Sequence, residues 1–188
     1  MKRILLATLL GGLIIFVWGS IHHMFLPISS AEFSGLPNEE AVLEVLAENI
    51  PEPGQYFYPW IDMSQQPSDA EMEAWNEKHR NGPVGILLYR PIGGEPMPPT
   101  MMVNEFLSNI FTALLLALIA ASLAGSWLKR SMLLSLVGLF AAGAISFSTW
   151  NWFGYPFIGM VSEALEVFIA ALLAGMLIAK LVPAPKMQ

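Results

Sequence analysis

Four long apolar stretches constrain this chain more than any other feature. Each has between 18 and 26 residues, and three of them contain no charged residue. A helix that rises 1.5 Å per residue needs about 20 apolar residues to cross a hydrocarbon core of about 30 Å. The pattern predicts a predominantly α-helical integral membrane protein, a four-helix bundle whose spans cover residues 4–21, 106–128, 131–150 and 157–182.

The first stretch has an alternative interpretation. Lys2 and Arg3 before an apolar run, with Ser29-Ser30-Ala31 downstream, are also typical of a secretory signal peptide. The run is longer than the usual 7–15 apolar residues of a signal peptide, and Trp18 and His22 separate it from the cleavage-like site. We therefore expect residues 1–27 to remain as the first transmembrane helix.

The basic residues predict an orientation in the membrane. Six of the nine fall on one side of a four-span arrangement, at the two chain ends and at the hinge expected between spans two and three. The positive-inside rule places that side in the cytoplasm. We therefore expect a multi-pass protein of the bacterial inner membrane with cytoplasmic termini. The six residues are Lys2, Arg3, Lys129, Arg130, Lys180 and Lys186.

Residues 28–103 differ in composition from the segments that flank them, 1–27 and 104–188. They contain 12 of the 15 acidic residues and three basic ones, so their net charge is −9, against +3 for the rest. An acidic segment of this kind is soluble and disfavours binding to nucleic acid or to anionic lipid. The sequence therefore predicts an acidic insertion on the periplasmic or extracellular side. Its acidic residues do not form the Asp-x-Asp-x-Asp-Gly pattern of a calcium loop.

Local patterns predict a small α/β unit inside the insertion. Asn38 is expected to cap a helix over 39–49, and Ser68 with Glu71 indicates a capping box for a helix that ends near Arg80. Short strands are expected at 55–58 and 84–89. We expect the first helix to bury one apolar stripe, formed by Val42, Leu43, Val45, Leu46 and Ile50.

Small residues four positions apart are typical of contacts between transmembrane helices. Spans two and three contain such a series, and spans one and four align residues on one face at offsets of four and seven, which favours a compact bundle, closed either within one chain or across a homodimer. The series are Thr8, Gly12, Gly19 and His23; Asn109, Ala113, Ala117, Ala121 and Gly125; Gly138, Ala142 and Ser146; and Glu163, Ala170 and Ala174.

Polar side chains near the outer ends of the spans form a candidate ligand or proton site. Ionisable groups inside a membrane are costly and often mark function. Glu163 and Glu166 lie three residues apart on one helix, and together with His23 they could hold a proton relay, a small polar ligand or a divalent metal ion. Alternatively, both glutamates are solvated in the first turns of their helix. The candidates are His22, His23, Glu105, Asn109, Glu163 and Glu166.

An aromatic string, Trp150-Asn151-Trp152-Phe153-Gly154-Tyr155-Pro156, predicts a tight outer turn between the last two spans. Tryptophan and tyrosine are common at the membrane–water interface. The turn is therefore expected to anchor the protein there, to line a quinone or lipid-headgroup pocket, or to dock against a larger complex. The interface candidates are Trp150, Trp152, Phe153 and Tyr155.

Several classes of chemistry are disfavoured by what the sequence lacks. The chain has no cysteine, which excludes disulfides, iron–sulfur clusters, thiolate zinc sites and c-type haem. It has no Gly-x-Gly-x-x-Gly, Walker, Gly-x-Ser-x-Gly or His-Glu-x-x-His motif. Adjacent histidines point about 100° apart, which disfavours joint metal chelation, and the last three spans contain no histidine for a bis-histidine haem. We expect no cofactor, no metal, no nucleotide and no nucleic acid.

The layout of one span, an acidic insertion and three spans with the Trp-Asn-Trp-Phe-Gly-Tyr-Pro turn resembles small uncharacterised integral membrane proteins of bacteria. The resemblance covers the layout of the whole chain and implies no activity. We expect a non-enzymatic accessory or assembly subunit that contacts lipid, a membrane-protein partner or a second copy through its insertion and aromatic turn. The alternative is a membrane protein that handles a proton, a metal or a small polar ligand through His23, Glu163 and Glu166.

Overall fold

The computed structural model describes residues 1–185 and is mainly helical. It divides into two compact units, which we describe separately. The helical unit consists of Met1–Ser34 together with the chain from Glu95 onward, and the inserted unit is Gly35–Gly94. Lys186, which we expected on the cytoplasmic side, lies outside the described residues.

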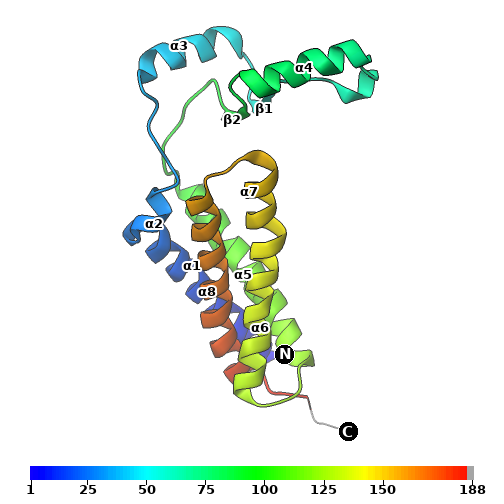
Figure 1. Cartoon of the computed structure of the whole chain (residues 1–188). Helices are drawn as coiled ribbons and strands as arrows, with labels where there is room; N and C mark the ends of the chain where they lie inside the picture. Colours follow the sequence, from blue (N-terminus) through cyan, green and yellow to red (C-terminus); the bar gives the residue numbers. More distant parts are fainter. Residues whose placement is uncertain (186–188) are drawn as a thin grey trace. The chain divides into compact units, whose positions relative to one another are not determined.

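Four long helices build the helical unit (Figure 1), and each is long and apolar enough to cross a membrane. This confirms the four apolar helices that the sequence predicts. The third is continuous but contains one π-helical turn, Ala142–Ser146. The helices are α1 (Lys2–Phe25), α5 (Pro99–Ser122), α6 with α7 (Trp127–Ala141 and Phe147–Phe153) and α8 (Phe157–Leu181), and the four-residue helix α2 (Pro27–Ser30) follows α1.

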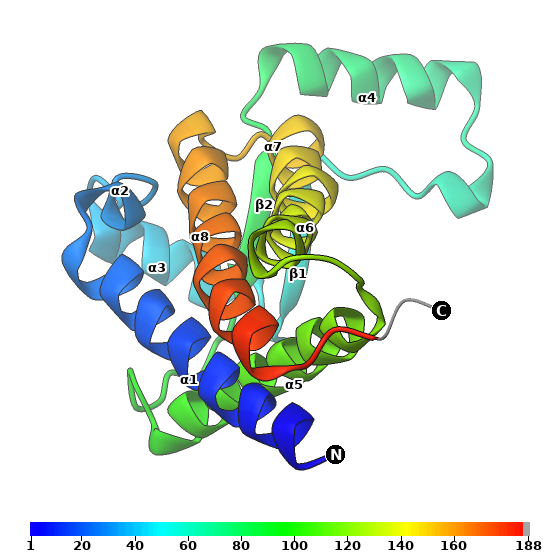
Figure 2. The same ribbon diagram turned by 90° about the horizontal axis from the view of Figure 1, so that it is seen from below.

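Helix α8 packs against both α1 and α6, and α5 packs mainly on α1. In Figure 2, α6 is seen nearly along its axis, with α8 tilted beside it, while α1 and α5 run obliquely across the view. Glycine allows the closest approaches: a Cβ built on Gly138 of α6 would lie 2.6 Å from the carbonyl oxygen of Val167 in α8. A Cβ on Gly12 of α1 would lie 2.9 Å from the Cα of Ile110 in α5. The backbones therefore meet with almost no side chain between them.

The predicted small-residue series mark these packing faces. Of the series named above, ten residues are buried. Gly125 instead lies in the turn after α5, with φ of 124°, and Ala121, Gly19 and Glu163 are only half-buried while His23 is exposed. The buried members are Thr8, Gly12, Asn109, Ala113, Ala117, Gly138, Ala142, Ser146 and the pair Ala170 and Ala174 of α8.

The expected hinge at Lys129-Arg130 is wrong, because both residues lie inside α6 and the turn precedes them. Arg130 is only 3% exposed. Its guanidinium donates hydrogen bonds to the carbonyl oxygens of Ala120 (2.7 Å), Ala179 (3.0 Å) and Val182 (2.9 Å). These carbonyls belong to the C-terminal ends of α5 and α8, where backbone oxygens lack helical partners and a positive charge is favourable.

The inserted unit contains the two helices and two strands that the sequence predicts. They are α3 (Glu39–Asn49), β1 (Gly54–Tyr58), α4 (Asp69–Asn81) and β2 (Gly85–Tyr89). The strands are antiparallel, with Tyr56 opposite Leu87. The Ser68–Glu71 capping box is present, and its hydrogen bonds from Ser68 hold the pKa of the Glu71 carboxyl below its usual range.

Two expectations for α3 are wrong. The side chain of Asn38 makes no capping hydrogen bond, because its backbone adopts a left-handed conformation (φ 60°, ψ 53°) rather than the extended one of an N-cap. The apolar stripe is not buried: Val42, Leu43 and Val45 are 36%, 48% and 58% exposed. No other described element packs closely on α3.

Candidate functional site

The site lies at the end of the helical unit where α1 ends and α5 and α8 begin, which we call the insertion end. Helix α8 starts at Phe157, so Glu163 and Glu166 are its seventh and tenth residues. They lie beyond the first turn, which contains no acidic residue. They lie in the second and third turns, and both residues are half-buried.

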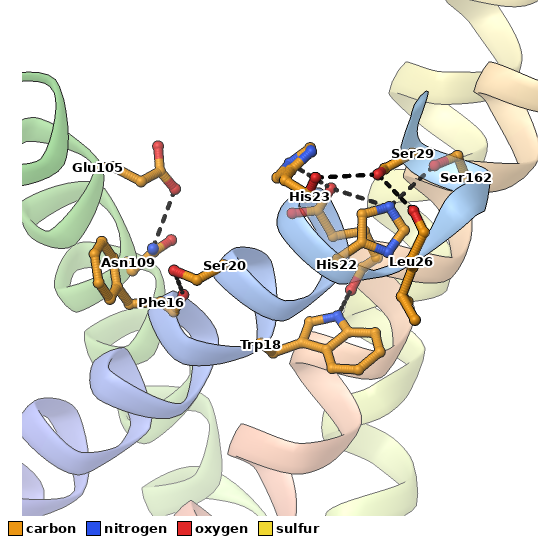
Figure 3. A network of polar contacts seen from close by, with 11 residues as sticks. Phe16, Trp18, Ser20, His22, His23, Leu26, Ser29, Glu105, Asn109 and Ser162 are labelled. Atoms are coloured by element: carbon orange, nitrogen blue, oxygen red, sulfur yellow. Dashed lines mark hydrogen bonds and ion pairs between the residues drawn. The ribbon is translucent and has the colours of Figure 1, made fainter. Parts of the chain in front are cut away.

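Glu166 connects polar groups of α1 and α8, and Figure 3 shows Trp18, His22 and His23 of α1 beside Ser162 of α8. One carboxylate oxygen, Oε2, lies 3.3 Å from Nε2 of His23 and 3.9 Å from Nε2 of His22. The backbone carbonyl of Glu166 accepts a 3.0 Å hydrogen bond from the indole of Trp18. The structure thus brings together three of the six predicted site residues.

The two histidines differ in burial. His22 is 1% exposed and its Nε2 is 3.0 Å from the hydroxyl of Ser162, whereas the His23 side chain is 62% exposed. We expected His23 on the packing face that begins with Thr8. At 100° per residue, His22 deviates from Thr8 by about 40° and His23 by about 60°, so His22 is the better match to that face.

The remaining candidates line a cavity beside this cluster. The cavity has a volume of about 460 Å³ and is bounded by α1, α5, the α6 helix with its π-helical turn, and α8. Glu105, Asn109, Glu163 and Glu166 all contribute to its wall. Asn109 is 8% exposed and donates a 3.1 Å hydrogen bond to the carboxylate of Glu105 (Figure 3). Glu166 therefore belongs both to the histidine cluster and to the cavity.

Ser146 is a wall residue whose importance the sequence did not suggest. It is 4% exposed and ends the π-helical turn, in which Phe147 N–H donates to the carbonyl of Ala142 five residues earlier. The hydroxyls of Ser131 and Thr149, on the same helix, each bond to the carbonyl four residues back. No side-chain hydrogen bond of Ser146 is found among the described residues, and its hydroxyl is not among the fully buried atoms there that lack a partner, so it remains accessible at the cavity wall.

Glu32 is a second residue that sequence reasoning missed, because it was counted with the acidic surface of the insertion. It belongs to the helical unit, and a Cβ built on Gly159 of α8 would lie 2.6 Å from its Oε2. Burial and the nearby carboxylate of Glu163 raise the pKa of Glu32, against the opposing effect of His23 and His22. No pattern in the sequence indicates this approach, because it depends on the fold of the short segment after α1.

The aromatic turn lies at the same end of the helices. Gly154 ends α7 in the left-handed conformation (φ 68°, ψ 25°), and Pro156 precedes α8. The rings of Trp150 and Phe157 contact edge to face, with centroids 6.0 Å apart. The other three interface candidates are exposed: Trp152 by 74%, Phe153 by 47% and Tyr155 by 39%.

Within residues 1–185, no group of three or more His, Asp or Glu side chains has a geometry that could hold a metal ion. The site is therefore a mixed cluster of carboxylates, imidazoles and hydroxyls beside a cavity. Comparison with protein-family models, with curated proteins and with solved structures finds no match to this chain.

Proposed function

We propose that the protein is a multi-pass integral membrane protein of the bacterial inner membrane that binds a small polar ligand, or exchanges protons with one, inside a four-helix bundle. A single observation carries the ligand site: Glu166 lies 3.3 Å from Nε2 of His23 and also lines a cavity of about 460 Å³. Small-molecule sites are typically concave and apolar, of about 300–1,000 Å³, with a few converging polar groups.

The polar groups at this site support binding rather than a purely structural role. Carboxylates and imidazoles that serve only packing are normally matched to partners within the protein. Glu163 has no hydrogen bond or ion pair among the described residues, and it reaches the same cavity as Glu105 and Glu166. A ligand or a transferred proton would complete this set of interactions.

A cavity-filling variant tests the ligand site. The full chain, in lipid nanodiscs, would be screened by thermal unfolding against small cations, small anions and neutral polar compounds. Ala141 lines the cavity, whereas Ala144 lies nearby on the same helix, is exposed and is not part of the wall. At least one compound should raise the Tm of the wild type and of Ala144→Leu but not of Ala141→Leu. If no compound distinguishes these proteins, the site does not bind a ligand.

The orientation is tested by impermeant thiol labelling. The chain has no native cysteine, so a single cysteine replacing Ser64 or Asn76 in the inserted unit gives an unambiguous signal. We expect labelling of intact cells from the outside, because the basic residues of the helical unit favour the opposite side as cytoplasmic. Labelling that occurs only after lysis would reverse the proposed topology.

A second proposal is that the protein is an accessory or assembly subunit of a larger membrane complex. It is favoured by aromatic side chains exposed within each unit: Trp152 at 74% in the helical unit and Trp60 at 72% in the inserted unit. Exposed large aromatic groups are common at interaction surfaces. Native purification in mild detergent should recover a defined partner, and Trp152→Ser should reduce its recovery. A clean monomer or homodimer without a partner contradicts this proposal.

A further inference from the structure

The charges on the cavity wall select a class of ligand. Three carboxylates, those of Glu105, Glu163 and Glu166, line the cavity, and no Lys, Arg or His is among the described residues of its wall. The nearest positive groups are the two histidines, which contact Glu166 from outside the wall. Glu163 and Glu166 are half-buried and Glu105 is exposed. Carboxylates that converge on one cavity repel one another, and an anionic ligand would increase that repulsion. A cation would reduce it.

Apart from the carboxylates and the polar residues Asn109, Thr112 and Ser146, the wall is apolar, which favours an organic cation over a bare ion. Aliphatic side chains from all four helices contribute, and an organic cation can place its alkyl groups against them. Ca²⁺ requires six to eight oxygens at about 2.3–2.6 Å, and among the described residues no group of three or more carboxylates or imidazoles has a geometry that could hold a metal ion. The aliphatic residues include Ile15, Leu116, Val137, Ile145 and Val167.

Ser146 provides an independent indication of a ligand. The residue is 4% exposed and lines the cavity, and no hydrogen bond from its hydroxyl is found in the described part of the chain. The hydroxyl is not among the fully buried atoms without a partner, so it remains accessible at the wall. A hydroxyl without a protein partner can bond to a ligand there. A ligand that carries a hydrogen-bonding head group would satisfy it, while Asn109 holds the carboxylate of Glu105 in place.

The cavity volume of about 460 Å³ falls within the range typical of small-molecule sites and suits one molecule of the size of a substituted amine.

From these observations we infer that the cavity binds a small organic cation with apolar substituents, an alkylated amine or ammonium ion, between the carboxylates of α5 and α8. This inference rests on the ligand site proposed above and names the chemistry of its ligand. The charged head group lies toward Glu105 and Glu163, and its apolar groups lie toward Val137 and Leu116.

The test compares benzyltrimethylammonium with neopentylbenzene, its uncharged isostere in which carbon replaces the nitrogen. Binding to the full chain in nanodiscs is measured by calorimetry. We expect the cation to bind at least about tenfold more tightly than the isostere, since a desolvated charge pair contributes more than about 1.4 kcal/mol. Glu163→Gln and Glu105→Gln should each weaken binding of the cation about tenfold and leave binding of the isostere unchanged. Glu44→Gln, on exposed α3, is the control.

The outcomes separate this inference from the ligand site itself. Equal binding of the cation and the isostere, or unchanged cation binding in the Glu105→Gln/Glu163→Gln double variant, overturns the cationic class. If only an anion or a neutral polar compound binds, and Ala141→Leu abolishes that binding, the ligand site holds and the cationic class is wrong. If Ala141→Leu changes the binding of no compound, both proposals fail. Circular dichroism and gel filtration establish that each variant is folded.

Discussion

The two ends of the helical unit treat ionisable side chains in opposite ways. At the end near the chain termini, Arg130 is 3% exposed and donates three hydrogen bonds to backbone carbonyls of α5 and α8. At the insertion end, Glu163 and Glu166 face a cavity of about 460 Å³. One end has a charge enclosed by fixed partners, and the other has charges beside open space.

This difference teaches how to separate structural from functional ionisable groups in an apolar protein. Arg130 is buried and the two glutamates are half-buried, and the two ends differ further in how their charges are paired. Arg130 is matched by carbonyls that the helix ends would otherwise leave without partners. Glu166 is paired with His23, whereas Glu163 has no hydrogen bond or ion pair among the described residues and retains capacity for a proton or a ligand. The following substitutions test this comparison, from the largest expected effect to the smallest.

Arg130→Met should give the largest loss of stability. It keeps much of the side-chain volume but leaves the carbonyls of Ala120, Ala179 and Val182 without their donor. Hydrogen bonds to a charged group contribute about 1.5–3 kcal/mol each, and they are not additive, so we expect a loss of about 3–5 kcal/mol. The free energy of unfolding in mixed micelles measures it. Lys129→Met is the matched control, since Lys129 is exposed on the same helix.

If Arg130→Met and Lys129→Met had equal effects, the guanidinium would not be a structural centre and the contrast between the two ends would disappear. Ligand binding at the insertion end should be retained by Arg130→Met once the protein is folded.

Gly138→Ala should cost about 1–3 kcal/mol, the usual cost of overpacking a tight core. The added methyl group would meet the carbonyl oxygen of Val167 at 2.6 Å and the Cα of Phe168 at 2.9 Å, so α6 and α8 would have to separate. Gly143→Ala is the control, because nothing lies within 4 Å of a Cβ at that position. Thermal unfolding of both variants tests whether α6 and α8 pack as closely at Gly138 as they do in the structure. Equal Tm values for the two variants would contradict it.

The pattern of small residues predicted the packing face of α6 well, because helical periodicity places Gly138, Ala142 and Ser146 on one face regardless of the rest of the fold. The four apolar helices, the two strands and the Ser68–Glu71 capping box also follow from local sequence. These features depend on length, spacing and neighbouring residues, which the sequence states directly.

The roles of Arg130 and Glu32 could not be predicted in the same way. Each depends on where distant segments meet: Arg130 on the ends of α5 and α8, and Glu32 on Gly159. The choice between His22 and His23 depended on a rotation of a few tens of degrees accumulated along α1. The exposure of the α3 stripe has a similar origin, because a buried face requires a partner surface that periodicity does not guarantee.

Ser162→Ala tests the insertion end, where we expect a smaller effect. His22 is 1% exposed, and its Nε2 would lose the hydroxyl 3.0 Å away, while Oε2 of Glu166 remains at 3.9 Å. Leaving a buried polar group with a weaker partner should cost about 1 kcal/mol. Ser122→Ala, which removes an exposed hydroxyl bonded at 3.4 Å to the carbonyl of Leu118, is the control. The free energy of unfolding of both variants is measured with denaturant. Equal values for Ser162→Ala and Ser122→Ala would mean that His22 does not depend on the hydroxyl of Ser162.

Glu32→Gln should give the smallest effect, and one that depends on pH. Burial and the charge of Glu163 raise the pKa of Glu32 above the ordinary value of 4.5, against the opposing effect of His23 and His22. Between the ordinary and the raised pKa, the folded protein binds more protons than the unfolded chain, so stability falls as the pH rises through this window. Glu32→Gln removes this loss. Its Tm should therefore match the wild type near pH 4 and exceed it slightly near pH 7, with Glu44→Gln as the control. A Tm difference that is constant with pH would mean that the charges of the insertion end do not affect the pKa of Glu32.

In Glu163→Gln the pKa of Glu32 should move back toward 4.5, which carbon-detected NMR of the glutamate carboxyl groups can measure. If that pKa does not change, Glu163 and Glu32 are not neighbours in the folded protein. Fewer carboxylates would then lie close together at the insertion end than the comparison of the two ends assumes.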